Sequence, residues 1–179
     1  SLDFSSGVSG SAVTSPVVVN GGVVSSATVG GNPKYVDGVV GTAIKFDGSG
    51  DVLHLPTLTN ITNAITLAAW VKFDTDETFE TLFSTDDYGG NGGFWLRRED
   101  NADGRLAFKL TYTDGNTSGE QETTQHSGFK VADGWVHIAV TWASSNGHID
   151  FYKNAFFYLN PFPSIFSFRE QYLQNQHPR

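Results

Sequence analysis

Seven polar and aromatic residues between positions 86 and 112 combine the chemical groups that protein sites use to hold a sugar. Tyr88 and Trp95 offer rings that can stack on an apolar sugar face, and the others offer oxygens, an amide or a guanidinium for its hydroxyls. The predicted ligand-binding residues are Asp86, Asp87, Tyr88, Asn91, Trp95, Arg97 and Tyr112. The carboxylates among them also suit calcium, and a solvated glycine-rich turn would explain the same loop.

Asp47 and Asp51 are the predicted metal ligands, because they flank the short turn Phe46-Asp47-Gly48-Ser49-Gly50-Asp51. Calcium takes about six to eight oxygen ligands in flexible geometry. The two carboxylates would therefore suit a structural calcium, which is the one cofactor that the sequence suggests. Each aspartate can instead accept hydrogen bonds within its own turn, as Asx turns do. Both interpretations stay open.

Catalytic patterns are weak in this chain. A glycosidase needs two carboxylates on one strand face, and the densest acidic group (Asp74, Asp76, Glu77 and Glu80) is predicted to lie in a loop. A polysaccharide lyase needs a cation beside a uronate and a His or Tyr as base. The residues that could supply these groups are Arg97, Arg98, His137, Tyr112 and Tyr152. We predict no catalytic residues and no enzymatic activity, and keep lyase and hydrolase as minor alternatives.

Short strands must position these groups. Residues 65–73 alternate between apolar and other side chains, which is the period of a half-buried strand. Similar runs recur between turns such as Asp103-Gly104 and Asn146-Gly147, and no helical period of any length occurs. The predicted strands are Ala12–Thr14, Pro16–Val19, Val23–Val29, Thr42–Phe46, Val52–Leu55, Ile65–Phe73, Glu80–Ser84, Gly93–Glu99, Arg105–Thr113, Trp135–Ala143 and His148–Tyr152, with a loop at Gly30–Val40. The fold class is all-β, an antiparallel two-sheet sandwich.

Two of the four tryptophans can be assigned from their strand faces. Trp142 shares its strand face with three apolar residues, which favours the core. Trp95 follows two glycines and shares its face with Arg97. Trp95 is therefore the tryptophan that we expect to face a ligand.

Composition excludes several classes of protein. A formal charge of −8 and a pI near 4.9 argue against binding to nucleic acid or to anionic lipid. The chain has no Cys, so it has no disulfide, thiolate nucleophile or Cys-ligated zinc. It has no Met, and the start at Ser1 indicates a processed or excised end that fits removal of a secretory signal. No apolar run approaches the roughly 20 residues of a membrane span.

The composition changes sharply at Asn154. Glycine is absent after Gly147, phenylalanine becomes dense, and Pro161 and Pro163 are incompatible with a central strand. We predict one domain over residues 1–154 and a Phe/Pro-rich tail over 155–179, packed on the domain or on a partner chain. Left exposed, such a tail would be an apolar patch large enough to drive self-association.

Four motifs together resemble one known family. They are the turn FDGSGD at 46–51, the tryptophan strand LAAWVK at 67–72, WVHIAVTW at 135–142 and FYKN at 151–154. Over roughly residues 2–154 the chain resembles the laminin-G-like, concanavalin A-like lectin/glucanase jelly-roll family. It departs at Ala155, where the family has Gly and then closing strands that carry a calcium-ligating Asp.

The resemblance implies a jelly-roll sandwich and a secreted, extracellular or cell-surface location. It also implies that Trp70 and Trp135 pack inside the fold. It implies a lectin-like recognition module that binds a glycan or an extracellular protein, with a role in cell adhesion and a structural calcium. The loops Tyr88–Gly93 and Asp114–Gly119 would line the site. The alternative is a structural or adhesive subunit of a surface assembly, joined through the tail.

Overall fold

The structure is a computed structural model of the chain. It describes residues 2–3, 7–14, 17–20, 23–55, 63–85, 93–100, 104–113, 118–125, 128–145, 147–154 and 156–158. For residues 2–3, 17–20, 23–26, 100, 111–113, 118–125 and 156–158, only the backbone is described. The chain divides into two compact units, residues 1–61 and 62–179, and each is described by itself.

The described residues of the first unit form three small antiparallel sheets. The first joins β1 (Leu2–Asp3), β2 (Val17–Asn20) and β3 (Val23–Ser26), the second pairs β4 (Thr28–Gly30) with β7 (Val52–His54), and the third pairs β5 (Lys34–Asp37) with β6 (Thr42–Lys45). The β2–β3 pairing joins two segments that were predicted as strands, Pro16–Val19 and the start of Val23–Val29. The prediction of a loop over Gly30–Val40 is wrong for Lys34–Asp37, because Tyr35 is buried and pairs with Ile44.

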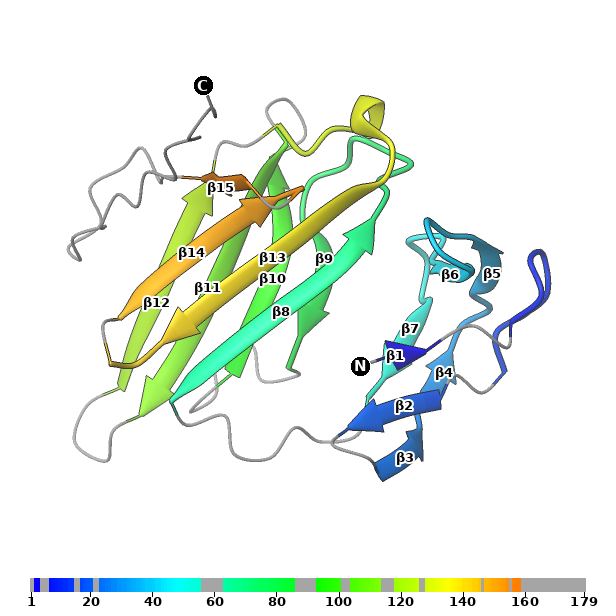
Figure 1. The fold of residues 1–179 in the computed structure, drawn as a ribbon, viewed down its shortest axis with the longest axis horizontal. Coiled ribbons are helices and arrows are strands. Elements are labelled where there is room, and N and C mark those ends of the chain that lie inside the picture. The colour runs from blue at the N-terminus through cyan, green and yellow to red at the C-terminus, as the bar shows by residue number, and fades with distance from the viewer. Residues whose placement is uncertain are drawn as a thin grey trace, which may run out of the picture. The chain divides into compact units, whose positions relative to one another are not determined.

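The second unit contains two antiparallel sheets of four strands (Figure 1). The first sheet has the order β15-β14-β13-β8, with bounds Phe156–Tyr158, His148–Lys153, Val136–Ala143 and Ala64–Val71. The second has the order β12-β11-β10-β9, with bounds Ser118–Gln125, Arg105–Thr113, Gly93–Asp100 and Glu80–Ser84. A 3₁₀ turn at Val131–Asp133 leads into β13.

The two sheets form a sandwich, and this confirms the predicted fold class. Every second residue of β13 is buried, and alternate residues of β14 are buried in the same way. In β10 the inward Phe94, Leu96 and Arg98 are buried, and so is Trp95 on the other side. The guanidinium of Arg98 on β10 lies 4.7 Å from the ring of Phe73, which follows β8 in the other sheet. Trp142 is 9% exposed and belongs to the core, which confirms its predicted position. Trp135 is only half-buried.

Two strands of this unit have no counterpart among the predicted ones. The sequence of β12, SGEQETTQ, contains no large apolar residue, so no hydrophobic period marks it. It forms a strand because its eight consecutive residues pair with β11. Strand β15 is the start of the Phe-rich tail, and it pairs with β14 through Phe156, Phe157 and Tyr158. The rest of the tail lies outside the described residues.

Within the part of the chain that the structure describes, no helix has the length and apolar character required to cross a membrane.

Candidate functional site

One side of the β15-β14-β13-β8 sheet carries an exposed aromatic ring. The inward residues of this sheet include Ile65, Ile138 and Phe151, all of them buried. The residues between them point the other way, because side chains alternate along a strand. We call this outward surface the Trp70 face and define it by Ala64, Thr66, Ala68, Trp70, His137, Ala139, Thr141, Ala143, His148, Asp150 and Tyr152.

Trp70 and His137 form one end of the Trp70 face. They are direct cross-strand partners, and their rings meet edge to face with centroids 5.4 Å apart. Asn154 holds the backbone of His137 from the other side, since its side-chain oxygen accepts the His137 N–H at 2.9 Å and its own N–H donates to the His137 carbonyl at 2.8 Å. The indole of Trp70 is 49% exposed, so the prediction that Trp70 packs inside the fold is wrong.

The middle of the Trp70 face is built from small side chains. Thr66 and Ala68 of β8 lie opposite Thr141 and Ala139 of β13. Along β14 the larger polar residues Tyr152, Asp150 and His148 follow one another at every second position. The result is a shallow floor of Ala and Thr with a polar wall along one side and the Trp70 ring at one end.

Asp150 is the acidic group of the Trp70 face. Burial of its carboxyl raises the pKa of Asp150 above its ordinary value, and the nearby His148 offsets this in part. A carboxylate in this environment has lost part of its hydration. It therefore gains from a hydroxyl donor more than a fully hydrated carboxylate would.

On the outward side of the other sheet, the ring of Trp95 is covered by a neighbouring side chain. Trp95, the predicted ligand-facing tryptophan, is 9% exposed, and the guanidinium of Arg97 lies 3.9 Å from its ring centroid. Arg97 also lies 4.9 Å from the ring of Phe79 and donates its Nε–H to Glu99. A sugar could stack on this face of Trp95 only by displacing Arg97.

Most of the other predicted ligand-binding residues fall where the structure gives no side chains. Asp86, Asp87, Tyr88 and Asn91 lie outside the described residues, as does the turn 114–117 in the second predicted loop. Tyr112 lies on β11, where it pairs with Gly119, and only its backbone is described.

The two predicted metal ligands organise a turn in the first unit. Asp51 accepts the backbone N–H of Asn32 at 2.6 Å with Oδ1 and that of Asp47 at 3.0 Å with Oδ2. Asp47 in turn accepts the N–H of Ser49 at 2.7 Å, as in an Asx turn. Gly31 has φ +73° and lies so close that a Cβ there would meet Asp51 Oδ1 at 2.3 Å. Asp51 therefore joins two loops through backbone hydrogen bonds.

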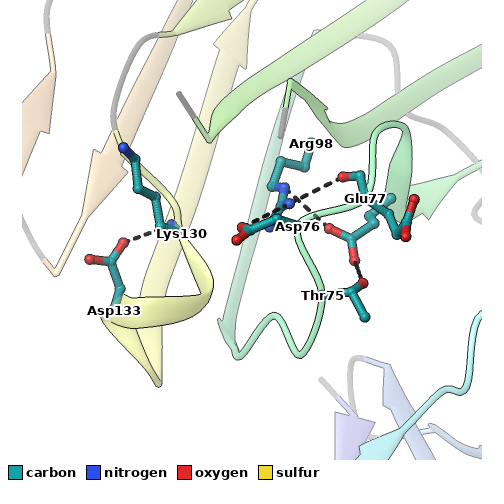
Figure 2. A network of polar contacts seen from close by, with 7 residues as sticks. Thr75, Asp76, Glu77, Arg98, Lys130 and Asp133 are labelled. Carbon is teal, nitrogen blue, oxygen red and sulfur yellow. Dashed lines mark hydrogen bonds and ion pairs between the residues drawn. The ribbon is translucent and has the colours of Figure 1, made fainter. Parts of the chain in front are cut away.

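A buried arginine binds several residues of the acidic loop that follows β8 (Figure 2). The sequence analysis did not identify this arginine as a structural residue. Arg98 is fully buried, and its Nη2 donates to Asp76 at 3.3 Å and to the Glu77 carbonyl at 3.1 Å. Its Nε lies 3.2 Å from Glu80 Oε2, within ion-pair distance but outside hydrogen-bond geometry. Burial raises the pKa of Glu80, although the Thr75 hydroxyl and Arg98 both act in the opposite direction.

The two arginines considered for lyase chemistry lie on other surfaces than the candidate bases His137 and Tyr152. Arg98 points into the sandwich and Arg97 lies on the outward side of one sheet, whereas His137 lies on the Trp70 face of the other. Among the residues with described side chains, no three His, Cys, Asp or Glu are grouped so that they could hold a metal ion.

The chain matches the model of a known family. The family model described as the concanavalin A-like lectin/glucanases superfamily, of the laminin G type, matches residues 47–157. These residues include the described strands of the second unit, except for Tyr158 at the end of β15. Searches of curated proteins and of solved structures give no match.

Proposed function

Because this chain belongs to the concanavalin A-like lectin/glucanase superfamily, we propose that it is an extracellular, non-enzymatic module that binds carbohydrate through the Trp70 face. Family membership supports a carbohydrate- or partner-binding module in general. The ring of Trp70 is half-exposed and is contacted at its edge by His137, and this observation favours a carbohydrate ligand over a protein partner.

The chemistry of this surface suits a sugar. A sugar ring has an apolar face of C–H groups and an edge of hydroxyls, so it needs an aromatic surface beside hydrogen-bonding groups. Trp70 supplies the first, and Asp150 with Thr141 supplies acceptors and a donor across the same surface. The His137 contact orients the indole before binding, which lowers the ordering cost of association.

The alternative role in a surface assembly has less support. It depended on a tail that needs a partner chain, but the first strand of that tail, β15, pairs with β14 of its own chain. The start of the tail therefore adds a strand to the sheet of its own chain, and this pairing does not require a second copy of the protein.

A pair of tryptophan variants tests the proposal on a glycan array. Trp70→Ala should abolish retention of every glycan that the unaltered chain binds, and Trp95→Phe, on the outward side of the other sheet, should retain them. Circular dichroism checks that both variants are folded. Loss of binding in Trp95→Phe with full binding in Trp70→Ala would move the site to the loops around Tyr88–Gly93 and sink the assignment to the Trp70 face.

A further inference from the structure

The length of the Trp70 face limits the size of its ligand. Ala64 and Trp70 stand at the two ends of the outward side of β8, six residues apart. At about 3.3 Å per residue, this distance is about 20 Å. Ala64, Thr66 and Ala68 are all exposed, so the floor between the ends is accessible along its length. A single sugar would leave most of this surface uncovered.

The charge of the same surface limits the chemistry of its ligand. Among the described side chains of the Trp70 face, Asp150 is the one carboxylate, and none is Lys or Arg. Lys72, which follows the end of β8, lies 3.7 Å from Asp74, so a carboxylate already balances its charge. The carboxylate of Asp150 would therefore repel an anionic sugar, and no Lys or Arg among the residues that define the face would offset this repulsion.

We propose that the ligand of the Trp70 face is an internal segment of an uncharged polysaccharide that lies along β8 and β13 across several sugar rings. This inference rests on the proposed function and specifies its ligand. One ring stacks on Trp70, the chain follows the floor of Thr66, Ala68, Ala139 and Thr141, and hydroxyls donate to Asp150. Because Asn63 and Ala64 are both exposed at the end of the floor opposite Trp70, the described side chains leave that end open to a chain that continues past it.

The experiment begins with a panel of soluble neutral polysaccharides, namely glucan, mannan, xylan and galactan, in affinity electrophoresis. Fragments of the retained polymer, from mono- to hexasaccharide, are then titrated by calorimetry, and oligogalacturonate serves as the anionic probe. Affinity should rise with each sugar up to about four and then level off, and the anionic oligomer should bind at least about fivefold more weakly than a neutral one of equal length.

Two variants assign the charge effect to one residue. Asp150→Asn should remove the discrimination against the anionic oligomer, and added salt should reduce it in the unaltered chain. Glu99→Gln is the matched control, because it removes the same charge from the outward side of the other sheet and should leave the discrimination intact.

The outcomes separate this inference from the proposed function. Equal affinity for a monosaccharide and a hexasaccharide, or tighter binding of the anionic oligomer, would overturn the ligand class while the site at Trp70 stands. No retention of any neutral polymer, or retention unaffected by Trp70→Ala, would overturn both.

Discussion

Arg97 and Arg98 are consecutive residues of β10, yet their guanidinium groups stack on rings on opposite sides of one sheet. Arg97 lies 3.9 Å from the ring centroid of Trp95 on the outward side, and Arg98 lies 4.7 Å from that of Phe73 inside the sandwich. Both arginines also hold the loop between β8 and β9: Arg98 binds Asp76, and Arg97 stacks on Phe79. The loop is thus attached to the sheet from two sides.

We expect Arg98→Met to destabilise the protein far more than Arg97→Met. Removing the buried cation leaves Glu80 without its ion pair, and a broken buried pair costs about 3–5 kcal/mol. The more exposed Arg97 should lose about 1 kcal/mol of ring and ion-pair contact. Urea unfolding measures both free energies. Equal losses in the two variants would contradict the structural role of Arg98.

The free energy of unfolding should depend on Glu80 above pH 4.5. Because burial raises the pKa of Glu80 from 4.5, the folded state binds its proton more tightly than the unfolded state does. The Glu80 contribution to stability is therefore greatest at low pH and falls as pH rises from 4.5 through the raised value. Glu80→Gln should flatten this part of the pH profile. Asp133→Asn is a control of opposite sign: burial alone would raise the pKa of Asp133, but hydrogen bonds from Lys153 and from the Lys130 N–H outweigh it and lower the pKa.

Asp51→Asn should destabilise the first unit equally with calcium and with chelator. The amide keeps one acceptor oxygen where the carboxylate uses two, so one of the N–H groups of Asn32 and Asp47 loses a charge-assisted bond worth about 1.5–3 kcal/mol. Thermal unfolding under both conditions measures the loss. A loss confined to the calcium sample would instead support the metal site predicted at Asp47 and Asp51.

The same turn gives a second variant that does not alter the carboxylate. Gly31→Ala should destabilise the turn by placing a Cβ against Asp51 Oδ1 and by straining a residue at φ +73°. Gly48→Ala is its matched control, since Gly48 also has positive φ, at 78°, but has open space around its Cβ position. If the two variants unfold at the same temperature, the close approach of Gly31 to Asp51 contributes nothing.

Trp142→Ala and Trp70→Ala should differ in stability although the two residues belong to one sheet. Trp142 is 9% exposed in the core, and its truncation should cost about 3–5 kcal/mol. Trp70 is 49% exposed on the outward side, so its truncation should cost about 1 kcal/mol or less. Urea unfolding compares them, and a large loss in Trp70→Ala would show that its ring contributes to packing after all.

The candidate site could be predicted from the sequence only in part. The alternation in residues 65–73 correctly placed Trp70 with Thr66 and Ala68 on one side of a strand. The same alternation places Trp70 opposite the apolar side chains of Ile65 and Leu67, and therefore outward, whereas the prediction that Trp70 packs inside the fold followed the family resemblance instead. The small residues of β8 and β13 are a sequence signal for the floor of this face. Their alignment, with Ala68 opposite Ala139, is known only from the pairing of the two strands.

The all-β class, most strand positions and the family could be predicted without coordinates, because they depend on local alternation, turn residues and short motifs. The surroundings of individual side chains became known only from the packing of the strands. The pairing of β12 with β11 made a strand from a polar segment, and the second sheet determined that Arg98 is buried while Arg97 is not. Burial, ion pairing and pKa arise from contacts between residues distant in the sequence, so no local pattern carries them.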